Sequence, residues 1–175
     1  MKAKMLFLVV MLLPFTGIGQ SVIKKDSLEY YKFHAQAQFD MVGDYKTSIL
    51  WLNKAIRLDP QDDELFFMRA FAKGLIEDFK GGEADLNIVI ALDPGNFAAH
   101  SGRAGARFRL KKYQEAISDY TWLIDEDPKY YGYYINRALC KLVLQDKDGA
   151  CMDFKTATNL GSREAYVIVI ERCLE

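Results

Sequence analysis

Apolar residues recur along the chain at intervals of three and four positions, in blocks of about 13 residues. This spacing places the apolar side chains on one face of a helix. The blocks are separated by two kinds of short polar segment: "VGDY", "IEDF", "LKKY" and "LQDK" between the members of a pair, and "DPQD", "DPGN" and "DPKY" between pairs. Because proline ends a helix, the pattern predicts successive pairs of antiparallel helices and an all-α fold.

The helix pairs repeat with a constant period. The segments "AIRLDP", "VIALDP" and "LIDEDP" start at positions 55, 89 and 123, and the windows 29–62, 63–96, 97–130 and 131–164 align further columns. A small residue stands in one column (Ser48, Gly82, Ala116, Ala150), and a large one follows four positions later (Leu52, Leu86, Tyr120, Phe154). A constant period of this length is typical of stacked helical repeats.

These columns resemble the tetratricopeptide repeat, a helix-turn-helix of about 34 residues with small and large residues at fixed positions and a closing proline. The resemblance covers residues 29–164 and implies an all-α, right-handed α-solenoid of four repeats. In the fourth window Ser162 replaces the proline, and the amphipathic segment 165–175 is expected to cap the last repeat. The aromatic residue that the family places early in the first helix is replaced by Lys32 and His100 in the first and third windows.

The N-terminus has the order of a signal peptide. Lys2 and Lys4 precede an apolar run at 5–13, which is followed by Pro14, Gly17 and Gly19. Nine apolar residues are far fewer than the roughly 20 that cross a bilayer, so no stable membrane span is expected. We therefore predict a signal peptide at 1–19, cleavage after Gly19, a secreted or periplasmic protein, and an N-terminal segment at 20–28. An uncleaved interfacial anchor is the alternative.

Charge and motifs exclude several classes of function. The formal net charge is −1, and it becomes −3 if residues 1–19 are removed, so the chain lacks the positive charge of a nucleic-acid binder. His34 and His100 have no companions at metal-ligand spacing, and no nucleophile elbow or phosphate-binding loop is found. We expect a non-catalytic protein without a metal or cofactor.

One set of charged columns predicts contacts between the two helices of a repeat. Windows two to four place arginine in the first helix and aspartate in the second, whereas window one has Ala35 and Trp51 in these columns. A buried unpaired charge is costly, so charges that are absent together are expected to touch. The predicted ion pairs are Arg69 with Asp85, Arg103 with Asp119 and Arg137 with Asp153. A polar binding strip is the alternative.

Three cysteines allow at most one intramolecular disulfide. Cys151 lies in the second helix of repeat four, and Cys173 lies in the helix expected to pack on it, so this pair is favoured. Cys140 with Cys151 is the rival pairing, and reduced cysteines in the core are a third alternative.

The resemblance also implies a function, since in this family the first helices line a concave groove that holds peptides or partner helices. The candidate groove residues are mainly apolar and aromatic: Tyr30, Phe33, Glu64, Phe67, Phe71, Phe108, Arg109, Ile135 and Leu139. Family members that grip a C-terminal carboxylate use Lys and Asn, but the matching columns hold Phe33, Ala37, Met68, Ala98 and Gly102.

Two hypotheses follow. The first is an adaptor or scaffold that binds another protein, with Phe67 and Phe71 as anchors. The second is a structural or homo-oligomer-forming subunit of a cell-envelope complex, whose own N-terminal segment fills the groove.

Overall fold

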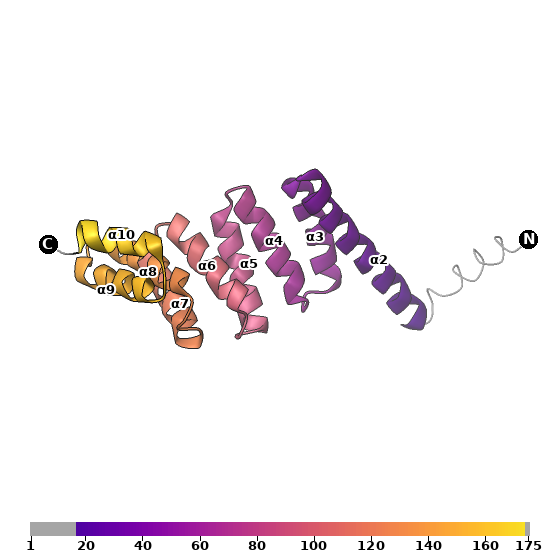
Figure 1. The fold of residues 1–175 in the computed structure, drawn as a ribbon. Helices are drawn as coiled ribbons and strands as arrows, with labels where there is room; N and C mark the ends of the chain where they lie inside the picture. Colours follow the sequence, from indigo (N-terminus) through magenta and orange to yellow (C-terminus); the bar gives the residue numbers. More distant parts are fainter. Residues whose placement is uncertain (1–16, 174–175) are drawn as a thin grey trace, which may run out of the picture. The chain divides into compact units, whose positions relative to one another are not determined.

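The computed structural model describes residues 17–173, and within this range it contains helices and no strand (Figure 1). The chain divides into two compact units after Ile76. This boundary falls inside the second repeat, between its two helices. The predicted signal peptide lies largely outside the described residues.

The first unit contains α2 (Gly17–Ala37), the π-helical turn η2 (Gln38–Val42), α3 (Tyr45–Leu58) and α4 (Asp63–Leu75). Its core is built from Ala35, Leu52, Ala55 and Leu65. The Ser48 hydroxyl donates a hydrogen bond of 2.9 Å to the Ala35 carbonyl, so the small residue lets α3 lie close to α2. Residues 20–28, the predicted N-terminal segment, are helical and belong to α2.

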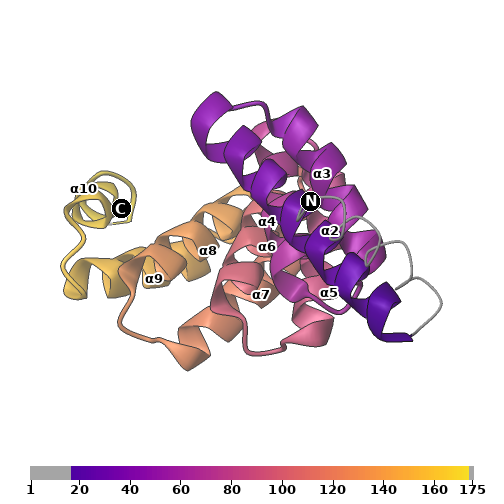
Figure 2. The same ribbon diagram turned by 90° about the vertical axis from the view of Figure 1, so that its right-hand side faces the viewer.

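The second unit contains α5 (Phe79–Leu92), α6 (Phe97–Arg109), α7 (Tyr113–Glu126), α8 (Tyr131–Val143), α9 (Lys147–Asn159) and α10 (Arg163–Arg172). Each helix packs against the next one along the chain (Figures 1 and 2). The helix starts follow the sequence period, since α6 and α8 begin one period apart, and so do α5, α7 and α9 in turn.

Side-chain caps explain several of these starts. Asn96 accepts a hydrogen bond of 2.9 Å from the Ala99 N–H, and the Ser162 hydroxyl accepts one of 3.2 Å from the Ala165 N–H. An N-cap of this kind stabilises a helix by about 1 kcal/mol. Asp62 also precedes a helix but does not cap it, because its carboxylate binds Lys32 Nζ at 2.6 Å. This hydrogen bond raises the pKa of Lys32.

The turn inside each repeat has a left-handed residue in the same column. Gly43, Glu77, Lys111 and Gln145 have φ values of 70°, 62°, 62° and 65°. Only the first repeat has glycine there. Left-handed backbone costs other residues about 1–2 kcal/mol, so three of the four turns retain local strain.

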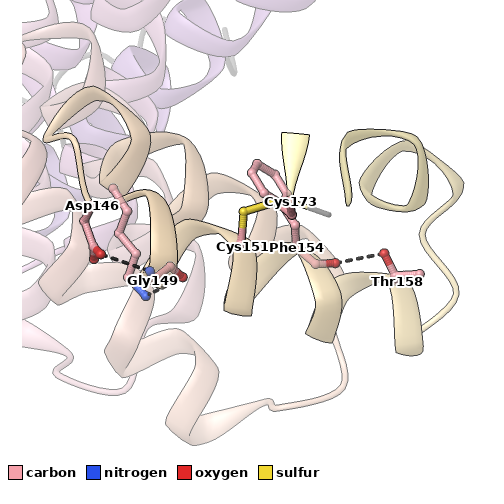
Figure 3. The surroundings of a disulfide bond; sticks show 7 residues. Asp146, Gly149, Cys151, Phe154, Thr158 and Cys173 are labelled. Atoms are coloured by element: carbon pink, nitrogen blue, oxygen red, sulfur yellow. Dashed lines mark hydrogen bonds between the residues drawn. A yellow bond between two sulfur atoms is a disulfide. The ribbon is translucent and has the colours of Figure 1, made fainter. Parts of the chain in front are cut away.

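The last helix is held by packing and by a covalent bond. The fully buried Ala165 of α10 joins a core that contains Ala138, Phe154 and Ala157. A disulfide joins Cys151 of α9 to Cys173 at the end of α10, with a Cα–Cα distance of 5.6 Å; Figure 3 shows it beside Phe154. This is the pairing that the sequence favoured.

The third cysteine, Cys140, is a buried free thiol. Burial raises its pKa to about 11.

Candidate partner-binding surface

Exposed aromatic side chains gather on the first helices of the first unit. Phe33 on α2 is 69% exposed, and Phe71 on α4 is 58% exposed. Phe33 and Phe67 are one repeat period apart and therefore occupy equivalent positions of successive repeats. Tyr30, Phe33, Phe67 and Phe71 form what we call the aromatic face.

The ring of Phe71 is supported from one side. It stacks on Phe39 of η2 with 5.6 Å between ring centroids, and Phe39 in turn meets the edge of Tyr45 at 5.2 Å. The π-helical turn thus carries an aromatic residue that braces Phe71 while leaving more than half of its side chain in solvent.

Tyr30 belongs to a second aromatic group around Trp51. The His34 ring lies 4.2 Å from Tyr30 and stacks on Trp51 at 5.0 Å. Lys54 Nζ lies 4.1 Å from the centroid of Trp51, a cation–π contact. In repeat one, Trp51 stands in the column that holds aspartate in the later repeats, and Ala35 stands in the arginine column.

The ion pair of repeat three is buried and shared. Arg103 donates from Nη2 and Nε to the two Asp119 oxygens, at 2.6 and 3.1 Å. Arg107 Nη1 donates to the same carboxylate at 2.7 Å, and its Nε donates to Glu83 at 3.1 Å. Lys112 Nζ binds the other Glu83 oxygen at 2.6 Å. Burial raises the pKa of Glu83, but the hydrogen bonds from Lys112 and Arg107 lower it by more. The net shift of the pKa is therefore downward.

Repeat four has the same arrangement. Arg137 donates to both Asp153 oxygens at 2.7 and 2.9 Å, and Lys141 Nζ lies 2.8 Å from the same carboxylate. The hydrogen bond to Asp153 raises the pKa of Arg137. Arg69 and Asp85 lie in different units, so their pairing stays a prediction.

The sequence did not predict a second partner of each arginine, which lies 16 positions earlier, in the second helix of the preceding repeat. Arg69 donates to Asn53 at 2.6 Å, Arg103 to Asn87 at 2.8 Å and Arg137 to Thr121 at 3.1 Å. The polar column at 53, 87 and 121 could have revealed it. These arginines therefore connect consecutive repeats, which is a structural role.

The family places an aromatic residue early in the first helix of each repeat. This column holds His100 in repeat three and Tyr134 in repeat four. His100 stacks on Trp122 at 3.7 Å, and its Nε2 lies 3.1 Å from the Pro94 carbonyl. The Tyr134 hydroxyl donates to the equivalent Pro128 carbonyl at 3.1 Å. Both rings thus bind the carbonyl of the proline that closes the preceding repeat.

Comparisons with known proteins bear on the family. No family model matches the sequence, and no curated protein is recognisably similar to it in sequence. Solved structures do match. MamA from Desulfovibrio magneticus RS-1 has a TM-score of 0.73 at 17% identity, covering 78% of this chain and 76% of its own. A tetratricopeptide repeat protein from Parabacteroides merdae has a TM-score of 0.74 at 20% identity, covering 81% of this chain and 57% of its own.

The first tetratricopeptide domain of Spaghetti (RPAP3), bound to the HSP90 peptide SRMEEVD, has a TM-score of 0.62 at 27% identity. The match covers 69% of this chain and 94% of that domain. The chain therefore has the tetratricopeptide-repeat fold.

The tetratricopeptide repeats of the second unit expose fewer of the predicted groove residues. Leu139 and Arg109 are exposed, whereas Phe108 is half-buried, with its ring 5.5 Å from Tyr113. Ile135 is only 8% exposed and packs in the core with Ala138 and Phe154, so its assignment to the groove is wrong. The column that holds Phe33 in repeat one points into the core in repeat four.

Of the tyrosines at 130–134, Tyr133 and Tyr134 pack against the core of the second unit, whereas Tyr130 and Tyr131 are about half exposed. Tyr130 lies 4.6 Å from Tyr133, which contacts the core that includes Tyr120 and Cys140. A side chain at Gly132 would collide with the Tyr130 ring.

Within residues 17–173, no group of three or more metal-ligating side chains is found. Within the same residues, no helix combines the length and the apolar character that a membrane span needs.

Proposed function

We propose that this protein is a non-catalytic interaction module whose aromatic face binds an extended peptide or an amphipathic helix of another protein. The exposure of Phe33 and Phe71 on first helices carries the proposal, because soluble proteins seldom leave grouped large aromatic side chains in water without a partner. The peptide bound by the RPAP3 domain supports it by analogy of fold.

The chemistry of the face favours a partner that contributes apolar side chains. Burial of one large apolar side chain contributes about 1.5–3 kcal/mol, so two or three aromatic contacts would supply a large part of the binding energy. The columns that grip a terminal carboxylate in other family members hold Phe33, Ala37 and Met68 here. Glu64 is exposed in the first turn of α4 and adds negative charge. Recognition therefore rests on internal apolar residues of the partner rather than on its C-terminal carboxylate.

We also propose that the protein is secreted or periplasmic. The order of charged, apolar and small residues in 1–19 supports this. Cleavage after Gly19 would leave α2 intact from Gln20 onward. Intact-mass measurement of the protein from culture medium or periplasm would detect a start at Gln20, and an uncleaved Met1 start would contradict the proposal.

The second hypothesis, a structural envelope subunit with a groove filled by its own N-terminal segment, has less support. Residues 20–28 continue into α2 as one helix, so they are not a free extended segment.

A photo-crosslinking experiment tests the binding proposal. A photoreactive phenylalanine analogue is placed at Phe33, at Phe71 and, as a matched control, at the exposed Leu50 on α3 of the same unit. We expect the same partner peptide at 33 and 71 and not at 50. The Phe33→Ala/Phe71→Ala variant should bind this partner at least tenfold more weakly, about 1.4 kcal/mol, whereas Leu50→Ala should bind normally. Equal adducts at all three positions, or unchanged binding by the double variant, would refute the face as the site.

A further inference from the structure

The outer side of α10 carries an apolar stripe. Ala165 is fully buried, and Ile168 and Val169 pack against the core of α8 and α9. On the other side of the helix, Tyr166, Val167 and Ile170 are each about half exposed. α10 is therefore apolar on two sides, and only one of them faces the core of its own chain.

A row of charges runs along the centre of this outer side. Arg163, Val167 and Glu171 are spaced four positions apart, so they form one row along the helix. All three side chains are exposed. The positive and negative ends lie at equal distances from Val167.

This row is complementary to itself. If two copies of α10 pack antiparallel about a two-fold axis at Val167, Arg163 of each copy faces Glu171 of the other. A two-fold contact uses the same patch on both copies and therefore requires this kind of self-complementarity. The apolar residues Val167 and Ile170 then meet at the centre of the contact, which is where an interface is most apolar.

The stripe is also held rigidly. Ser162 caps the start of α10, and the disulfide between Cys173 and Cys151 ties its end to α9 (Figure 3). A surface that is already ordered loses less conformational entropy on association.

We propose that the outer side of α10 is the contact through which two copies of this chain form a symmetric dimer. One helix of 10 residues offers a small contact area, at the low end for specific interfaces, so the dimer dissociates on dilution. This contact uses other residues than the aromatic face. A variant that stays monomeric should therefore still bind the proposed partner.

Sedimentation velocity of the oxidised protein over a range of concentrations tests the proposal. We expect a monomer–dimer equilibrium in the wild type. Val167→Asp should raise the dissociation constant at least tenfold, because it places two carboxylates at the axis. Val143→Asp is the matched control: Val143 is similarly exposed at the end of α8, and its substitution should leave the equilibrium unchanged. Circular dichroism would verify that each variant retains its helices.

A charge exchange identifies the second copy as the partner. Arg163→Glu and Glu171→Arg should each weaken the dimer, since each places like charges opposite one another. The variant carrying both substitutions should recover the wild-type dissociation constant. A monomer at every concentration, a dimer insensitive to Val167→Asp, or failure of the double exchange to recover affinity would each overturn the proposal. The Phe33→Ala/Phe71→Ala variant should dimerise normally, so loss of partner binding and loss of dimerisation are separable.

Discussion

Removal of Asp119 should destabilise the second unit more than any exposed charge substitution. Its carboxylate is 4% exposed and is the shared acceptor for Arg103 and Arg107. Asp119→Leu leaves two mostly buried guanidinium groups without this partner, and breaking a buried pair costs about 3–5 kcal/mol. Arg103→Met leaves Asp119 with Arg107 and should cost less.

The double variant separates pairing from desolvation. If Arg103 and Asp119 interact directly, the Arg103→Met/Asp119→Leu variant should be more stable than the sum of the single effects indicates, by about 1.5–3 kcal/mol. Urea unfolding followed by Trp122 fluorescence measures this, because Trp122 stacks on His100 beside the pair. A Trp51→Phe background removes the only other tryptophan.

A matched control uses an exposed pair of the same kind. Arg109 lies 3.8 Å from Glu77, with both side chains more than half exposed, and its guanidinium lies 4.7 Å from the Phe79 ring. Arg109→Met should cost no more than about 1 kcal/mol. A coupling energy near zero for Arg103 with Asp119, or a loss for Arg109→Met as large as that for Asp119→Leu, would refute the assignment of a structural ion pair.

Three further predictions concern single positions. Gln145→Gly should stabilise the protein by up to about 1 kcal/mol in the same urea assay, since it relieves the left-handed strain at φ 65°; no gain would contradict the strain. Cys140 should be the only thiol that a thiol reagent labels in the denatured, non-reduced protein, with three thiols after reduction; a second thiol before reduction would contradict the disulfide. Glu83→Gln should destabilise the protein near neutral pH. Because the pKa of Glu83 is lowered on folding, this difference should be full above about pH 4.5 and should disappear as the pH falls further. A difference that persists in acid would exclude a role for the ionised carboxylate.

The helices were predictable because their causes are local. The constant repeat period indicated the positions of the turns, and caps such as Asn96 and Ser162 lie at the helix starts that the pattern predicted. The joint absence of arginine and aspartate from window one was enough to pair Arg103 with Asp119. A residue pattern that recurs in several repeats can be recognised even where one repeat departs from it.

The candidate site was less predictable because it depends on how individual repeats differ. Ile135 shares a column with the exposed Phe33, yet it is buried because repeat four packs this position into its core. The support of Phe71 by Phe39 depends on the π-helical turn, which no other described repeat has. The N-terminal extension of α2 escaped prediction because residues 20–28 lie before the first window, where no repeated column guides the assignment.

The column that holds Trp51 in repeat one holds aspartate in the later repeats. This difference limits which repeats can be exchanged for one another. Trp51 needs Tyr30 and His34 as neighbours, whereas Asp119 needs Arg103. A transplanted helix from the first repeat would place an indole against a guanidinium that had lost its carboxylate, and the reverse exchange would bury a charge among aromatic rings. Repeats three and four are interchangeable parts in this respect, but the first repeat is not. The order of repeats along the chain is thus fixed by side-chain compatibility as well as by connectivity, and shuffled arrays should fold only when the first repeat keeps its place.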